Sequence, residues 1–181
     1  MKLKLNLGSG PKLLPGYENV DLDAEGAVHQ DIVEYLQQCK YASVDEVILS
    51  HILEHLPYEK ETALFKELPR ILAPGATVHI QVPDLAWVCE QFANAYESEF
   101  EWYQPGHHDH YFGGGRDMSK RWSFLLGCLY GNQSSPGQFH VNGYTEHKLT
   151  CIAKLTGLQL TRLEHRSYKG LQCLDATMMN L

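Results

Sequence analysis

The sequence has few basic residues and no long apolar run. Its 15 lysines and arginines stand against 22 aspartates and glutamates, which leaves a net charge of -7, and the basic residues are scattered. Nucleic-acid binding needs clustered positive charge, so nucleic acid is disfavoured as a partner. No apolar segment approaches the roughly 20 residues that cross a bilayer, and Gly8, Gly10 and Pro11 interrupt the first apolar run before a signal peptide could form. We therefore expect no membrane span.

Paired cysteines and linker-like segments are also missing. The five cysteines are odd in number, widely spaced and free of any CxxC pair. This pattern indicates reduced thiols, so we expect a cytoplasmic protein. Proline, glycine and serine form no linker, and no repeat is visible. With 181 residues, of which 44% are hydrophobic, the chain is predicted to form a single domain, residues 1–181, of an oligomeric state that the sequence does not indicate.

What the sequence does contain is an alternation of strand-like and helix-like segments. Extended segments are predicted at residues 3–7, 17–22, 44–50, 77–82, 159–168 and 171–179. Helical spacing of apolar residues is found at 31–38, 51–72, 84–96, 121–132 and 145–156. Such alternation predicts an α/β fold with a largely parallel sheet and helices on both faces. Only five residues, "DAEGA", separate the second extended segment from "VHQ", so we expect a rudimentary third strand and early helices that are shortened or lost.

A glycine turn follows the first strand and a carboxylate follows the second. Gly8 and Gly10 have no Cβ, so the turn "NLGSG" can bend sharply and bring backbone close to a ligand. Asp21 ends the next strand, where a carboxylate can accept hydrogen bonds from two ribose hydroxyls. A dinucleotide fingerprint would need a third glycine at the position of Leu13, and only nine residues separate the two strands. The pattern therefore favours a nucleoside cofactor without phosphates.

Several further motifs occur in a fixed order after this turn: "GYENVDLD", "SHILEHL" and "PRILAPGATVHIQVPD". With "LNLGSG" they make the chain resemble the class I S-adenosylmethionine-dependent methyltransferases, and more narrowly a compact bacterial subgroup. The resemblance is dense from Lys2 to about Phe92. It implies a Rossmann-like methyltransferase sheet, mostly parallel with an antiparallel edge strand, and S-adenosyl-L-methionine as the cofactor.

The resemblance also implies which residues hold the cofactor. Gly8, Ser9 and Gly10 would wrap its methionine part, and Asp21 would bind the ribose with Leu22 against the adenine. The remaining cofactor-binding positions that it implies are Asn6, where most of the superfamily has an acid, Asp31 and Ile32 at the adenine, and Ser50 with His51 beneath the sulfonium.

The stretch "HILEH", His51 to His55, also matches the HxxEH zinc motif, in which Glu54 would be catalytic. That motif needs a regular helix, and Pro57 disturbs the next turn, so a zinc hydrolase is the weaker alternative. Residues 97–117 show no periodicity and are predicted to be a lid or substrate loop. Three histidines of this segment could collect a metal, but no cysteine or paired carboxylate completes a site, so we assign no metal ligand.

Methyl transfer to a hydroxyl is helped by a base, and histidine has a suitable pKa. His55 and His140 are the candidates, with His110 behind them. The acidic, aromatic and histidine-bearing lid suits a small polar acceptor, such as a sugar hydroxyl or a glycan precursor, better than a polyanion. A protein that binds S-adenosylmethionine without turnover is the other alternative.

Overall fold

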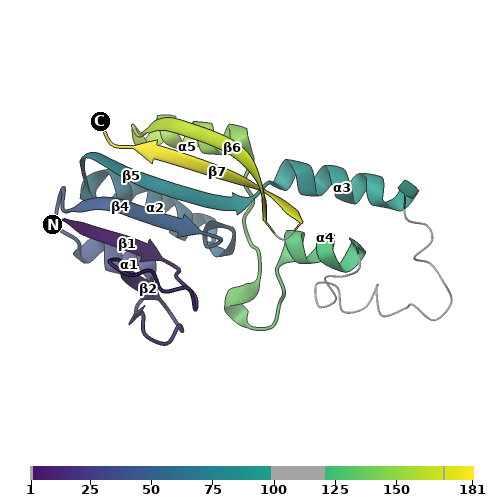
Figure 1. Ribbon diagram of the computed structural model, residues 1–181, viewed down its shortest axis with the longest axis horizontal. Coiled ribbons are helices and arrows are strands. Elements are labelled where there is room, and N and C mark those ends of the chain that lie inside the picture. Colours follow the sequence, from purple (N-terminus) through teal and green to yellow (C-terminus); the bar gives the residue numbers. More distant parts are fainter. Residues whose placement is uncertain (1, 99–120, 169) are drawn as a thin grey trace.

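The computed structural model describes residues 2–98, 121–168 and 170–181. Their strands form one seven-stranded sheet in the order β3-β2-β1-β4-β5-β7-β6 (Figure 1). The strands are β1 (Leu3–Leu7), β2 (Glu18–Asp21), β3 (Val28–His29), β4 (Val44–Ser50), β5 (Leu72–Pro83), β6 (Gln159–Tyr168) and β7 (Leu171–Met179). β1 to β5 pair in parallel, and β7 runs antiparallel to both β5 and β6. The predicted Rossmann-like, mostly parallel sheet is confirmed, although its antiparallel strand lies one place in from the edge.

The sheet has a reversal point between β1 and β4. The chain runs from β1 outward to β2 and β3, and then returns to the other side of β1 as β4. Loops that follow neighbouring parallel strands diverge at such a point and leave a crevice beyond the carboxyl ends of the strands, where ligands of open α/β sheets bind. A ligand site is therefore expected among the segments that follow β1, β2 and β4.

The helices that cover the sheet are α1 (Ile32–Gln38), α2 (Tyr58–Ile71) and α5 (Glu146–Thr156). Figure 1 shows all three on the same face of the sheet, whereas α3 (Leu85–Ser98) and α4 (Arg121–Tyr130) lie beyond the carboxyl ends of the strands. The expected Rossmann-like arrangement of helices around the sheet is therefore present, and within the described residues the three helices that pack on the sheet share one face. Right-handed crossovers that step in one direction place their helices on one face, and the opposite steps here are too short to carry any.

Those opposite steps are the connections β1–β2 and β2–β3. Neither the residues between β1 and β2 nor those between β2 and β3 form a helix, and β3 is only two residues long. The expected loss of early helices and the rudimentary third strand are thus observed. β3 nevertheless pairs in parallel with β2, through Val20↔Val28 and Asp21↔His29.

The two faces of the sheet differ in polarity: the face covered by helices is apolar, and the opposite face carries charged and polar side chains. The helical face holds the apolar core, to which β1, β4 and β5 contribute alternate residues. Its members include Leu5, Leu7, Leu36, Val47, Leu49, Leu64, Leu68, Val78, Ile80 and Leu149. On the opposite face polar side chains pair with one another: Lys4 Nζ lies 2.8 Å from Glu46 Oε2, and Arg166 Nη1 lies 3.1 Å from Asp175 Oδ2. A sheet face of ion pairs can stay hydrated, as antiparallel sheets often do.

The predicted helix at 51–72 is broken at its start. Residues Leu53–His55 form a single 3-10 turn, η1, and α2 begins only after Pro57. Pro57 lacks the N–H that a continuing helix would need, so the chain restarts there. Within the described residues, no helix combines the length and apolar character that crossing a bilayer requires.

Candidate functional site

The turn after β1 is held in place by two asparagines. Gly8 and Gly10 both have positive φ angles, +64° and +49°, in the region that side chains with a Cβ rarely adopt. The buried side-chain amide of Asn6 donates to the carbonyl of Lys12 (3.1 Å) and to Oδ1 of Asn19 (2.8 Å). A carboxylate at this position would repel the two acceptor oxygens, whereas the neutral amide of Asn6 donates to both and links the turn to the start of β2. Ser9 is also buried.

The carboxylate of Asp21 lies directly against this turn. Its Oδ2 accepts from the backbone N–H of Gly10 at 2.8 Å, and its Oδ1 accepts from the N–H groups of Asp23 and Ala24 at 3.0 Å each. Leu22 beside it is 59% exposed. The turn and the carboxylate, eleven residues apart in sequence, therefore form one continuous surface at the tips of β1 and β2.

The two glycines differ in what surrounds them. A Cβ on Gly8 would lie 2.3 Å from Cγ1 of Ile52, which is closer than any real contact, so Gly8 packs directly against the segment after β4. A Cβ on Gly10 would meet no atom of the described residues within 4 Å. Gly8 is thus required by protein packing, whereas Gly10 borders open space that a ligand can occupy.

Asp31 and Ile32 begin α1. Oδ1 of Asp31 accepts from the N–H groups of Val33 and Glu34, which makes Asp31 the N-cap, and its Oδ2 lies 2.5 Å from Lys60 Nζ. Burial raises the pKa of the Asp31 carboxyl, whereas Lys60 and the two capped amides lower it. The lowering effects are together the larger, so the pKa lies below its usual value. Ile32 is 5% exposed and packs in the core.

The segment after β4 carries the second half of the site. Ser50 donates through its hydroxyl to Oε1 of Gln81 at 3.2 Å. His51 has a φ of +55°, and its Nδ1 lies 3.2 Å from Oε1 of Glu54, a residue only 2% exposed. Burial opposes protonation of His51, but Cys173 and the Glu54 carboxylate favour it, and the pKa rises to about 10. Among the residues that the structure describes, neither His51 Nε2 nor Glu54 Oε2 has a hydrogen-bond partner, although both atoms are buried.

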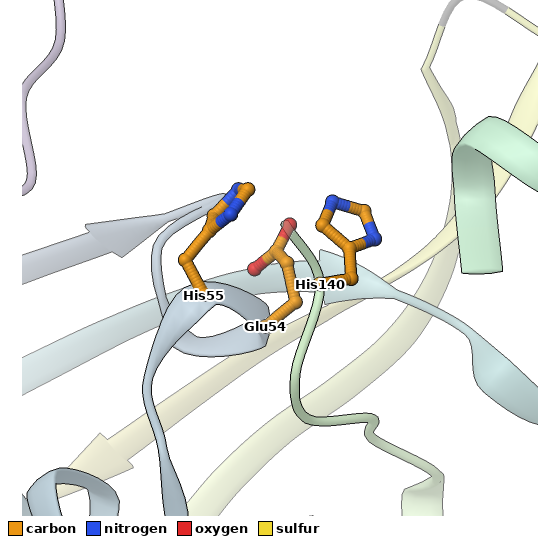
Figure 2. Close-up of side chains that lie close together, drawn as sticks. All are labelled: Glu54, His55 and His140. Carbon is orange, nitrogen blue, oxygen red and sulfur yellow. The ribbon is translucent and has the colours of Figure 1, made fainter. Parts of the chain in front are cut away.

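Figure 2 shows the side chains of His55 and His140 on either side of Glu54. The two imidazole rings lie edge to face with their centroids 4.7 Å apart. Nδ1 of His55 lies 3.1 Å from the carbonyl of Phe139, and Nδ1 of His140 lies 2.8 Å from the carbonyl of Cys128. Because a carbonyl can only accept, each Nδ1 carries the hydrogen and each Nε2 keeps a lone pair. Burial lowers the pKa of His140 despite the nearby charge of Glu54.

His140 is brought to Glu54 by backbone contacts of its own segment. The N–H groups of Val141 and Asn142 donate to the carbonyl of Glu54 at 2.9 and 3.1 Å. Tyr144, fully buried, donates its hydroxyl to Oε1 of Glu61 and so anchors the same segment to α2. The sequence placed His140 near the ligand, but no spacing rule connects it with a residue that precedes it by 86 positions.

These groups line a pocket of about 240 Å³. Its lining comprises His51, Glu54, His55, Pro83, Gly127, Cys128, Gly131, Asn132, Gln138, His140, Tyr168 and Leu171. The ring of Tyr168, which the sequence did not single out, lies 5.2 Å from that of His51. A larger groove of about 560 Å³ lies between α2 and α5, on the helical side and not at the strand ends.

Two sequence expectations concern this region, one about zinc and one about a lid. Since His51 precedes η1 in a left-handed conformation and pairs with Glu54, His51 and His55 do not form the helical histidine pair of the HxxEH zinc hydrolases. His110 and residues 99–117 of the expected lid lie outside the described residues, and residues 97–98 belong to the end of α3.

Comparison with known proteins identifies the fold. No protein-family profile matches the sequence, and no curated protein sequence matches it. Among solved structures, the chain is similar to 1,6-didemethyltoxoflavin-N1-methyltransferase of Burkholderia thailandensis, solved with 1,6-didemethyltoxoflavin and S-adenosylhomocysteine (TM-score 0.61, 16% identity, 98% of this chain and 70% of the other). It is also similar to an S-adenosylmethionine-dependent methyltransferase of Archaeoglobus fulgidus (0.60, 15%, 98% and 86%) and one of Methanosarcina mazei (0.58, 13%, 99% and 92%). At these identities the likeness establishes a shared fold.

Proposed function

We propose that the protein is an enzyme that binds S-adenosylmethionine at the turn after β1 and transfers its methyl group to a small polar acceptor. The observation that carries this proposal is the joined surface of the Gly8–Gly10 turn and the Asp21 carboxylate. Gly8 packs against Ile52, in the same segment after β4 that supplies His51, Glu54 and His55 to the pocket. The shared fold supports it, because similar solved structures are S-adenosylmethionine-dependent methyltransferases.

The residues on the donor side fit a nucleoside. The space in front of Gly10 admits a ligand against the main chain, and the Asp21 carboxylate offers an acceptor for the ribose hydroxyls beside it. Exposed Leu22 would cover one face of the adenine, and Asp31 would accept from its amino group. Asn6, Ser9 and Ile32 would shape the cradle from beneath, and Ser50 and His51 would border the sulfonium.

On the acceptor side, the chain supplies positioning. The bound cofactor would supply an electrophilic methyl group, so the protein need only align the acceptor atom with it. The Nε2 atoms of His55 and His140 and the amides of Asn132 and Gln138 border the pocket and can hold hydroxyl groups. This lining supports a sugar hydroxyl or a similar small metabolite as the acceptor. The five free cysteines support a reducing compartment such as the cytoplasm.

Calorimetric titration with S-adenosylmethionine, S-adenosylhomocysteine and NAD tests the donor half. We expect the first two to bind one molecule per chain and NAD to give no heat, because the turn lacks a pyrophosphate site. Incubation with S-adenosylmethionine labelled in the methyl group and a panel of sugars tests turnover. Binding with no labelled product from any acceptor would favour a binding protein without catalysis, and equal binding of NAD would contradict the proposal.

The proposed role of Asp31 can be separated from its structural role. Asp31→Ser keeps a good N-cap but removes the oxygen that would reach the adenine. We expect the affinity for S-adenosylhomocysteine to fall roughly fivefold to tenfold, which corresponds to the loss of about one hydrogen bond. The melting temperature should change little, because serine keeps the cap of α1. Lys60→Gln is the matched control, since it breaks the same ion pair and leaves the carboxylate. If both variants lose equal affinity, Asp31 does not contact the adenine.

A further inference from the structure

We propose that Glu54, His55 and His140 bind a divalent transition-metal ion. One ligand atom from each residue lies within 4.8 Å of the other two, and within the described residues no other group of histidine, cysteine and acidic side chains meets this condition. Figure 2 shows the carboxylate between the two rings. The set was not apparent in the sequence, where HxxEH would have paired His51 with His55.

Each of the three residues has an atom with a lone pair that can bind a metal ion. The Nδ1 atoms of His55 and His140 face backbone carbonyls, so each Nε2 keeps a lone pair that can bind a metal. Oε1 of Glu54 faces His51, whereas Oε2 has no partner within the described part of the chain. The chain therefore presents two imidazole nitrogens and one carboxylate oxygen around a common point.

The unpartnered oxygen of Glu54 points most directly to a missing ligand. The side chain is 3% exposed, and a buried carboxylate oxygen without a partner is costly and uncommon in native proteins. His51 engages only the other oxygen of this carboxylate. A cation held by Oε2 would satisfy the atom that the described residues leave unpaired.

The surroundings of the three residues are those that metal ligands usually have. Histidine ligands generally donate their second ring N–H to a carbonyl or carboxylate, and ligating carboxylates are themselves hydrogen-bonded. Here the carbonyls of Phe139 and Cys128 and the imidazole of His51 fill these outer positions. The contacts of Val141 and Asn142 with the Glu54 carbonyl fix the distance between the two chain segments.

The donor set selects the class of metal. Two imidazoles with one carboxylate suit zinc, iron(II) or cobalt(II), whereas magnesium and calcium prefer oxygen ligands throughout. Tetrahedral zinc would need ligand atoms about 3.4 Å apart, given metal–ligand bonds of about 2.1 Å. Small side-chain rotations close the difference from the observed limit of 4.8 Å. Three protein ligands leave at least one coordination position open to the pocket.

The inference changes the role of the two histidines in the proposed function. A lone pair that binds a metal cannot accept a proton, so His55 and His140 would be ligands and not bases. An acceptor hydroxyl bound at the open position would lose its proton to solvent more readily because the cation stabilises the oxyanion. This consequence rests on the proposed methyl transfer, whereas metal binding itself does not.

Metal binding is tested on full-length protein with any purification tag removed, after dialysis against a chelator. We expect zinc to bind one ion per chain in calorimetry, and cobalt(II) to develop visible absorption bands that zinc then abolishes. Glu54→Gln, which keeps the side-chain volume, and His140→Ala should each weaken zinc binding by more than the roughly 10-fold to 100-fold that loss of an outer-shell partner costs. His55→Ala, at a more exposed position, serves if either variant fails to fold.

His29→Ala is the control, since His29 is exposed on β3 and outside the cluster. Absence of stoichiometric zinc or cobalt binding would overturn the inference, as would binding that the three ligand variants leave unchanged. Titration with S-adenosylhomocysteine on the same samples keeps the two proposals apart. If the wild-type protein binds the nucleoside but no metal, only the metal site is contradicted. If it binds the metal but not the nucleoside, only the proposed function is contradicted.

Discussion

Asp21→Ala is expected to lower the affinity for S-adenosylhomocysteine by at least about 100-fold. A hydrogen bond to a charged group contributes roughly 1.5–3 kcal/mol, and the two ribose hydroxyls would each donate one, which together correspond to about 100-fold or more. The carboxylate also organises the turn, because its Oδ2 accepts from Gly10 and its Oδ1 from Asp23 and Ala24. The substitution therefore removes both a ligand contact and part of the scaffold of the site. Calorimetry measures the change.

Asp23→Ala is the matched control for this experiment. It removes a carboxylate of the same charge two residues away, at an exposed position, and leaves the backbone N–H that Asp21 accepts. We expect it to bind the nucleoside as the wild-type protein does. A similar affinity for wild type and Asp21→Ala would show that the nucleoside does not contact Asp21, and equal losses in the two variants would point to a general effect of charge.

Substitution of the two glycines of the turn by alanine should affect different properties: mainly the stability at Gly8 and mainly the affinity for the cofactor at Gly10. At Gly8 the strain of a left-handed residue, about 1–2 kcal/mol, adds to the overpacking against Ile52, about 1–3 kcal/mol, so we expect a loss of roughly 2–5 kcal/mol in unfolding free energy. At Gly10 only the backbone strain applies, because a Cβ there meets no atom in the part of the chain that the structure describes. Its methyl group would instead project into the proposed cofactor space.

Urea unfolding and nucleoside titration on both variants check this contrast. Gly10→Ala should remain folded and lose more affinity for S-adenosylhomocysteine than its stability change explains. Gly8→Ala should mainly lower the free energy of unfolding, because the added methyl group must displace Ile52 in the segment after β4. Equal stability losses with unchanged affinity in Gly10→Ala would mean that the open space beside Gly10 is not where the cofactor lies.

The half of the site near the N-terminus could be predicted because it is local in sequence. Glycines that need positive φ and a carboxylate at the end of the next strand are identified by residue type and spacing alone. In the structure Gly10 and Asp21 do meet, through a backbone hydrogen bond of 2.8 Å. The short connections after β1 and β2 were equally readable, since too few residues are present to form crossover helices.

The other half depends on contacts that no local pattern encodes. His140 reaches Glu54 through the backbone of its own segment, and the unpartnered Oε2 of Glu54 is visible only in three dimensions. The one-sided covering of the sheet is also a tertiary result. The short early connections were predicted, but their consequence, a polar face stabilised by pairs such as Lys4 with Glu46, was not.

A crystal structure of the complex with S-adenosylhomocysteine is the most direct measurement of the central claim. The account predicts the ribose hydroxyls within hydrogen-bonding distance of the Asp21 carboxylate, the amino-acid part of the ligand against Gly8 to Gly10, and its sulfur facing the His51 side of the pocket. Density for the nucleoside in the groove between α2 and α5, or anywhere else away from the tips of β1 and β2, would contradict it.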